Sequence, residues 1–440
     1  TEEALISSGG DKEYASLPEQ HRFVIPDGCH WQEVRERTEN LGAAIVGAMR
    51  QIEIANPDTL YGVLSMFSSQ KWTNKAILND SKIRDLIEHL SKRELGNKDY
   101  PADLMGDAYE ILLKKFADDS KAQAGEFYTP RSVVRLLVHI LDPQPGETIY
   151  DPACGSGGML IEAIRYMHDD FLCCGSIFGQ EKNVVNAAIA KMNLFLHGAS
   201  DFNVMQGDTL RDPKILQGGN IAKFDCVIAN PPFSLENWGA TEWSSDKYKR
   251  NIYGTPSDSC GDYAWIQHMI CSMVSGQGRM AVVMPQGILF RNQETEIRKQ
   301  LVESDLIEAV VTLGDKLFYG TGLSPCFLII RRMKPAHHFG RILMIDGSKI
   351  LTQKRAQNIL EENDIDRLYS LYQNYSDEED YSRIVTLQEI RDKEYNLSPN
   401  RYVVYHKEEI RPYAEVLAEF KHAYEEVKRL EEEFSLLINA

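Results

Sequence analysis

Apolar residues recur at helical spacing in the first 120 residues of the chain. Between His30 and Gln51 they fall every three or four positions, and the same spacing returns between Asp103 and Phe116. Asp103 has a side chain suited to a helix N-cap. We therefore expect residues 1–120 to form an N-terminal helical domain.

The pattern changes after Gly146, where short apolar runs alternate with helical stretches. We predict strands at 148–150, 176–179, 203–206, 224–229, 279–284, 306–312 and 326–331. We predict helices between most of them, at 158–168, 184–197, 263–275 and 293–303. Alternation of this kind favours parallel pairing and a doubly wound α/β sheet. The expected fold is a mostly parallel, seven-stranded, Rossmann-like sheet in a catalytic domain at 121–350.

Two further segments follow the predicted sheet. Residues 351–404 show no clear period and are expected to form an irregular connecting segment. In the tail at 405–440, apolar residues from Tyr413 to Val427 follow a 4-3-4-3 spacing, which predicts a helix. That helix either packs onto its own domain or forms a coiled-coil arm that docks a partner.

Composition excludes several classes of protein. With 43% hydrophobic and 26% charged residues, the chain is not disordered, collagen-like or a disulfide scaffold. No apolar run approaches the roughly 18 residues of a membrane span, and residues 1–14 lack a signal-peptide pattern. Eight cysteines without a CxxC pair suit a reducing cytoplasm and argue against zinc, so we predict no metal.

The chain carries 48 basic and 65 acidic residues, a net charge of −17. Contacts to phosphates dominate the affinity of proteins for nucleic acid. The net charge therefore argues against a chain that holds nucleic acid by itself. It leaves open a local positive groove, or a basic partner that supplies the grip.

A glycine-rich turn, DPACGSGG, lies between the first predicted strand and its helix. Glycines at such a turn let the backbone approach a ligand closely, and ligands bind at the carboxyl ends of parallel strands. Glu181 and Asp208 follow the next two strands, where they are placed to accept hydrogen bonds from a ribose and an adenine amino group. The alternative is that each acid caps a helix. The cofactor-binding residues predicted from this pattern are Asp151, Ala153, Gly155, Ser156, Gly157, Gly158, Glu181 and Asp208.

The charge of the turn indicates which nucleoside binds there. A dinucleotide site would place G-x-G-x-x-G and a helix N-terminus at the pyrophosphate. Here Asp151 precedes the glycines, and its carboxylate would repel a pyrophosphate. It would attract the ammonium and sulfonium of S-adenosyl-L-methionine, which we therefore predict as the cofactor.

A second motif, Asn230-Pro231-Pro232-Phe233, follows the strand predicted at 224–229. Two consecutive prolines end the strand and stiffen the turn. The Asn230 side-chain oxygen and the Pro231 carbonyl would then accept both hydrogens of a planar amino group, drawing its lone pair toward the methyl group. Phe233 offers a face on which the ring can stack. The motif predicts direct methyl transfer governed by positioning and electrostatics.

The order GEFYTP (125–130), DPACGSGG and NPPF resembles the modification (M) subunit of type I restriction-modification systems, an N6-adenine DNA methyltransferase of the gamma class. The resemblance covers roughly residues 30–405 and includes the segment NLSPNRYV at 396–403. It implies an S-adenosylmethionine-dependent methyltransferase fold, a ribose-binding role for Glu181 and a catalytic role for the NPPF motif. It also implies that the cofactor touches Ser156 to Gly158 and the residues Glu126, Phe127, Tyr128, Thr129, Pro130 and Arg131.

An adenine must leave the duplex to be methylated, so we expect some residues to touch the extruded strand. Aromatic and basic residues mix in the 234–261 segment after NPPF, as at a nucleic-acid interface. The alternative is an ordered surface loop with solvated charges. The predicted DNA-binding residues are Trp238, Trp243, Lys247, Lys249 and Arg250.

No recognition domain is apparent after the core, so we expect another chain to choose the target sequence. The resemblance implies a specificity (S) subunit, a second modification subunit and, in the full complex, a restriction (R) subunit, all acting on double-stranded DNA in the cytoplasm. We expect the tail and the N-terminal domain to supply subunit contacts. Rival functions are methylation of a glutamine amide in proteins and a cofactor-bound scaffold without catalysis.

Overall fold

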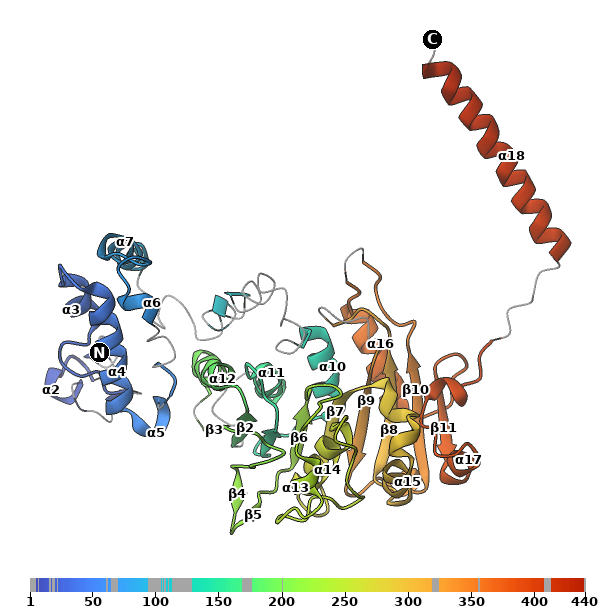
Figure 1. The fold of residues 1–440 in the computed structure, drawn as a ribbon, viewed down its shortest axis with the longest axis horizontal. Coiled ribbons are helices and arrows are strands. Elements are labelled where there is room, and N and C mark those ends of the chain that lie inside the picture. Colours follow the sequence, from blue (N-terminus) through green and yellow to red (C-terminus); the bar gives the residue numbers. More distant parts are fainter. Residues whose placement is uncertain are drawn as a thin grey trace.

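The fold was analysed in a computed structural model of the 440-residue chain (Figure 1). The structure describes residues 5–6, 8–15, 17, 20–21, 23–60, 62–64, 70–93, 104, 106, 108–109, 111–112, 129–167, 176–199, 201–318, 324–354, 357–406 and 413–438. The predicted GEFY segment and most of the helix predicted at 103–116 lie outside these residues.

A large twisted sheet forms the centre of the described chain. Its order is β11-β10-β8-β9-β7-β6-β1-β2-β3, and most neighbours are parallel, while β9 is antiparallel to β7 and β8, and β11 to β10. The strands are β1 (Ile149–Asp151), β2 (Ile177–Glu181), β3 (Phe202–Gln206), β6 (Cys226–Ala229), β7 (Arg279–Pro285), β8 (Ile307–Leu313), β9 (Pro325–Arg331), β10 (Arg341–Gly347) and β11 (Ser382–Thr386). A separate two-stranded hairpin joins β4 (Leu216–Gln217) to β5 (Asn220–Ile221).

The α/β prediction is confirmed, and every predicted strand is present. The predicted strand count of seven is wrong for the described residues, because β10 and β11 extend the sheet to nine. β7, β8 and β9 are buried along almost their whole length, which explains their nearly continuous apolar sequences.

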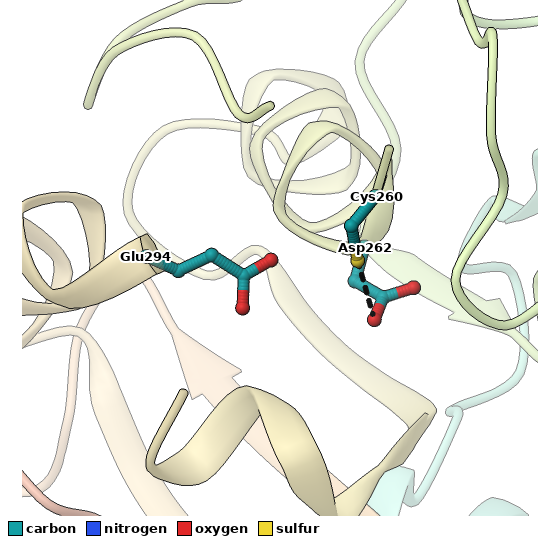
Figure 2. A group of neighbouring side chains, drawn as sticks. All are labelled: Cys260, Asp262 and Glu294. Carbon is teal, nitrogen blue, oxygen red and sulfur yellow. Dashed lines mark hydrogen bonds between the residues drawn. The ribbon is translucent and has the colours of Figure 1, made fainter. Parts of the chain in front are cut away.

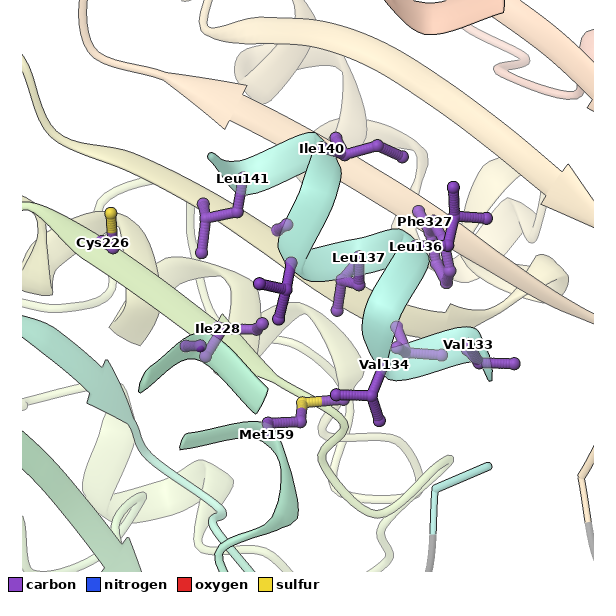
Figure 3. Close-up of a cluster of buried hydrophobic side chains, with 14 of the residues drawn as sticks. Val133, Val134, Leu136, Leu137, Ile140, Leu141, Met159, Cys226, Ile228 and Phe327 are labelled. Carbon is purple, nitrogen blue, oxygen red and sulfur yellow. The ribbon is translucent and has the colours of Figure 1, made fainter. Parts of the chain in front are cut away.

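Helices cover both faces of the sheet (Figure 1). One face carries α10 (Arg131–Leu141), α11 (Gly158–Met167), α12 (Val184–Leu196) and α16 (Glu362–Asn374), while the other carries α14 (Asp262–Ser272), α15 (Thr295–Glu303) and α17 (Leu387–Asp392). Alternate strand residues enter two separate cores; Ala281 and Val283 of β7 face α10, whereas Met280 and Val282 face α14. Figure 3 shows apolar side chains of α10 beside Ile228 of β6, Phe327 of β9 and Met159 of α11.

The N-terminal region is helical, as predicted, in its described parts. Its helices are α2 (Lys12–Ala15), α3 (Trp31–Glu36), α4 (Leu41–Ala55), α5 (Pro57–Leu60), α6 (Gln70–Thr73) and α7 (Asp80–Leu90). The predicted helix at 30–51 is interrupted at Asn40, whose φ is 54°. The Asp80 carboxylate accepts hydrogen bonds from the backbone N–H groups of Asn40 and Leu41 at 3.1 and 3.0 Å, so a distant side chain caps the new helix.

The expectation of an irregular segment at 351–404 is wrong. It contains α16, β11 and α17, and β11 pairs with β10 from Arg341↔Thr386 to Ile345↔Ser382. The elements are only partly buried, so few apolar residues mark them: α16 buries only Ile365, Leu368 and Leu371. The sheet therefore continues past residue 350, where we had placed a domain boundary.

The tail forms α18 (Tyr413–Ile438), which confirms the predicted helix. In Figure 1 it stands away from the sheet and its covering helices. Its described side chains are almost all exposed, which favours an arm over a helix packed onto its own domain. Among the residues that the structure describes, no helix combines the length and apolar character needed to cross a bilayer.

Candidate active site

The predicted site residues gather at one edge of the sheet. The chain runs from β1 outward through β2 and β3 in one direction and through β6 and β7 in the other, so the topological switch lies between β1 and β6. Ligands bind in the crevice outside the carboxyl ends of the strands at such a switch. Asp151, Glu181 and Asn230 each end, or directly follow, one of three neighbouring strands, β1, β2 and β6.

The glycine-rich turn is held against β2. The Cys154 backbone N–H donates to the Gln180 carbonyl at 3.1 Å, and Gly155 and Gly157 have φ values of 52° and 83°. An added Cβ at Gly157 would be in ordinary van der Waals contact with Ala190 of α12, at 3.4 Å. The glycines are therefore explained by the left-handed turn.

Glu181 is tied to the glycine-rich turn by its side chain. One carboxylate oxygen accepts from the Gly155 N–H at 3.0 Å and the other from the Asn183 N–H at 2.7 Å. Each oxygen keeps a further lone pair for a ligand hydroxyl. Burial raises the pKa of Glu181 despite these bonds. Asp208, one strand further along, pairs with Lys182 at 2.9 Å.

Asp151, at the end of β1, is a deeply buried acid. It is 2% exposed, and its Oδ1 accepts from the Ala153 N–H at 2.9 Å. Burial, and then repulsion from Glu181, raise the pKa of Asp151 to about 8. An added cation would relieve both effects, so the position suits a positively charged ligand group.

Asn230 presents a buried acceptor at the same edge of the sheet. Its Nδ2 donates to Thr129 Oγ1 at 2.8 Å, which fixes the orientation of the amide. Its Oδ1 is buried and has no hydrogen-bond partner among the described residues. Leaving a buried acceptor unpaired costs about 1–3 kcal/mol, so such an atom calls for a functional explanation.

Contacts of Phe233 and of the following residue, Ser234, hold the rest of the NPPF motif in place. Pro231 is buried, Pro232 is exposed, and the half-buried Phe233 ring lies 6.3 Å from the Phe318 ring. Ser234 follows with a φ of 50°, and its N–H donates to Asp262 Oδ1 at 2.7 Å. Asp262 thereby holds the strained residue that ends the motif.

A buried acidic cluster supports this turn. Figure 2 shows the Glu294 carboxylate directed toward Cys260 and Asp262, the one group of potential metal ligands found among the described residues. Arg291 provides positive charge there: its guanidinium pairs with Asp262 and, at 2.9 Å, with Glu294. It also donates to Ser234 Oγ at 3.4 Å. We assign the cluster to an ion-pair network behind the motif.

The predicted DNA contacts of Trp238, Trp243 and Arg250 are wrong for the described structure. The two tryptophans are each 2% exposed and pack edge to face at 5.5 Å, and Arg250 is 1% exposed. The Arg250 guanidinium binds Asp246 and the carbonyls of Thr209 and Leu210. These side chains therefore pack in the interior of the 234–261 insertion.

Lys247 and Lys249 of the same insertion are exposed, as a DNA contact requires.

In the cofactor-binding set, Glu126, Phe127 and Tyr128 lie outside the described residues. Of their neighbours, Thr129 contacts Asn230, Pro130 is the N-cap of α10 and Arg131 begins that helix. Asp262 and Arg291 were missed by the sequence analysis, because no motif marks residues that act on a turn 28 to 57 positions away.

Comparison with known proteins identifies the family of the chain. The pattern of the N-6 DNA Methylase family matches residues 100–410. The type I restriction enzyme MjaVII methylase subunit of Methanocaldococcus jannaschii is 35% identical over 422 residues, which cover 92% of this chain and 70% of that protein. The chain spans about two thirds of the length of such curated relatives, from 65% to 70% in three of them.

Solved structures show the same fold. The methyltransferase subunit of a type I restriction-modification system from Streptococcus thermophilus is 26% identical, with a TM-score of 0.78 over 91% of this chain and 87% of that one. A putative class I S-adenosylmethionine-dependent methyltransferase from Listeria monocytogenes is 15% identical, with a TM-score of 0.51 over 78% and 98% of the two chains, and shares the fold. The chain therefore belongs to the N-6 DNA methylase family, the adenine-specific DNA methyltransferases that include the methylase subunits of type I restriction enzymes.

Proposed function

We propose that this chain is the modification subunit of a type I restriction-modification system and transfers a methyl group from S-adenosyl-L-methionine to the N6 amino group of an adenine flipped out of DNA. One observation carries the assignment: Asn230 Oδ1, directly after β6, is buried and has no hydrogen-bond partner in the part of the chain that the structure describes. An exocyclic amino group would satisfy it.

The crevice residues fit the proposed cofactor. Asp151 is a buried carboxylate suited to a cation, and Glu181 offers two oxygens to a ribose. When bound, S-adenosylmethionine supplies an electrophilic methyl group on a sulfonium. The glycine-rich turn between them leaves room for close backbone contact.

The NPPF residues have distinct roles in this proposal. Asn230 Oδ1 and the Pro231 carbonyl accept the two N6 hydrogens and orient the nitrogen lone pair toward the methyl donor. Thr129 holds the Asn230 amide in place at 2.8 Å, and Phe233 offers a ring face to the adenine. Positioning and preset acceptors supply the catalysis.

Relatives named as methylase subunits of type I restriction enzymes support the proposed partners. A specificity subunit would read the sequence of the double-stranded DNA, with a second modification subunit and a restriction subunit in the full complex. The DNA substrate makes the cytoplasm the proposed location. Asp208, paired with Lys182, keeps its proposed place near the cofactor adenine.

Cofactor affinity should depend on pH through Asp151. Because its pKa is about 8 in the free protein, the carboxyl is protonated at pH 6 and must lose its proton to pair with a cation. The dissociation constant of wild type, divided by that of Asp151→Asn, should fall about tenfold per pH unit from pH 6 toward 8. Calorimetric titration of S-adenosylmethionine into both proteins measures this ratio. A ratio that does not vary with pH would remove Asp151 from the site.

Mass spectrometry of the product tests the reaction itself. We expect N6-methyladenine after the complex reconstituted with its specificity subunit is incubated with target DNA and S-adenosylmethionine. Boiled complex, and DNA that lacks the recognised sequence, serve as controls. Methylated glutamine in a release-factor-like protein, with unmodified DNA, would favour the rival enzyme class.

A further inference from the structure

A cavity with basic walls lies where the start of α15 meets the segment that follows α17. Its volume is about 820 Å³. Two segments line it, the start of α15 with the turn before it and the stretch after α17. The lining residues are Phe290, Asn292, Thr295, Glu296, Arg298, Lys299, Arg391, Lys393, Glu394, Tyr395, Asn396, Ser398, Asn400 and Arg401.

The charge of this cavity is opposite to that of the whole chain. Five basic and two acidic residues line it, whereas the protein carries a net charge of −17. Arg391 pairs with Glu303 at 2.6 Å, which still leaves the bases in excess. Lys299, Lys393 and Arg401 are exposed, and Asn and Ser side chains between them add neutral hydrogen-bonding groups. These groups together suit a phosphate-bearing ligand.

Arg298 adds a buried positive charge to the wall. It is 2% exposed, and its guanidinium donates to the carbonyls of Tyr395 and Arg291 at 2.8 and 2.9 Å and to Thr295 Oγ1 at 3.2 Å. All these partners are neutral. The carbonyls position the guanidinium without cancelling its charge, so the field of Arg298 favours an anion in the cavity.

The rim of the cavity is held in a costly conformation. Glu394 and Tyr395 have φ values of 54° and 57°, although neither is glycine. The turn is kept in place because the Tyr395 N–H donates to the Ile390 carbonyl at 2.9 Å and the Tyr395 hydroxyl to Glu303 at 2.9 Å. Left-handed non-glycine residues persist where the surrounding structure enforces them, often at binding sites.

A chain of contacts links the cavity to the proposed catalytic motif. Ser234, directly after NPPF, contacts Arg291, whose carbonyl accepts from Arg298 in the cavity wall. Phe290, which also lines the cavity, precedes Arg291 and is 50% exposed. Arg291 therefore connects the turn after the motif to the wall of the basic cavity.

We propose that this cavity binds the sugar–phosphate backbone of the DNA strand next to the flipped adenine. The proposal rests on the proposed function, since it takes the NPPF motif as the place where the base is held. It provides an acidic chain with a local, positively charged contact to DNA. Trp238 and Arg250, which were predicted to make such contacts, are buried. Lys299 and Lys393 contact phosphates, while Arg298 attracts the strand without touching it.

Salt dependence of DNA binding tests the proposal. The complex with the specificity subunit is titrated with a labelled duplex that contains the recognised sequence, at several salt concentrations and without methyl donor. In the double variant Lys299→Gln/Lys393→Gln, the slope of log affinity against log salt should become shallower by about 2, roughly 0.9 per lost phosphate contact. The matched control Lys82→Gln/Lys223→Gln removes two exposed lysines outside the cavity and should keep the wild-type slope.

Assembly and cofactor binding are measured for the same variants. An unchanged slope in the Lys299→Gln/Lys393→Gln complex would overturn the proposal. Loss of assembly with the specificity subunit would overturn it too, because the cavity would then be a protein-docking site. The readout is binding without methyl transfer, so it stays interpretable if the enzyme proves to methylate another group.

Discussion

Asn230→Ala should reduce methyl transfer to DNA at least about 10²- to 10³-fold while S-adenosylmethionine still binds. The substitution removes the acceptor Oδ1, which is buried and has no partner among the residues that the structure describes. Removing one preset hydrogen-bonding group from a catalytic site has effects of this size. The rate is measured as labelled methyl incorporated into duplex by the reconstituted complex, and cofactor affinity by calorimetry.

Two further variants make this result specific. Thr129→Val removes the 2.8 Å bond that orients the Asn230 amide, so it should slow transfer less than Asn230→Ala does. Asn374→Ala changes an exposed asparagine near the end of α16 and should leave the rate unchanged. Wild-type rates for Asn230→Ala would favour the scaffold function, in which the chain only positions other subunits.

Deleting residues 413–440 should abolish assembly with the specificity subunit. α18 exposes large apolar side chains along its length, which folded chains rarely leave in water without a partner. Each such side chain contributes about 1.5–3 kcal/mol when buried. These residues are Val416, Phe420, Tyr424, Val427, Leu430 and Phe434, which are 46–66% exposed. Size-exclusion chromatography of the two subunits measures the complex, and cofactor titration of the truncated chain should match wild type.

Substitutions test whether assembly needs the apolar side chains of α18 or only the presence of the helix. Phe420→Ser, Leu430→Ser and Phe434→Ser together should weaken assembly at least about 100-fold. The control combines His422→Ser, Glu425→Ser and Glu432→Ser, which change exposed polar residues of the same helix. Equal assembly by both variants would show that the subunits meet elsewhere, for example through the N-terminal helices.

The sequence predicted the sheet well because its central strands are apolar along their whole length. Runs such as MAVVM in β7 and FLII in β9 have few alternatives to a buried strand. β10 was missed although it carries the apolar run ILMI, and α16 was missed although Ile365, Leu368 and Leu371 recur at helical spacing. β11 was missed since its burial depends on pairing with β10, which no local pattern records. The break at Asn40 was missed for the same reason, because Asp80 imposes it from 40 residues away.

Site residues in motifs were easier to predict than residues that support them. DPACGSGG and NPPF follow strands, so the fold alone brings Asp151 and Asn230 to one edge. The error over Trp238, Trp243 and Arg250 arose because aromatic and basic residues suit either a nucleic acid or an internal cation–π contact. The Arg250 guanidinium lies 4.4 Å from the centre of the Trp243 ring, so it makes an internal cation–π contact.

The antiparallel strand β9 has a consequence for how the protein is made. It pairs with both β7 and β8, yet the ribosome completes it after either of them. A nascent chain that has emerged only to residue 318 therefore holds two apolar strands that cannot pair as they do in the finished sheet. Unpaired strand edges favour aggregation. Only after translation past residue 331 can β9 fill the position between β7 and β8, and the second edge of β8 stays unpaired until β10 follows.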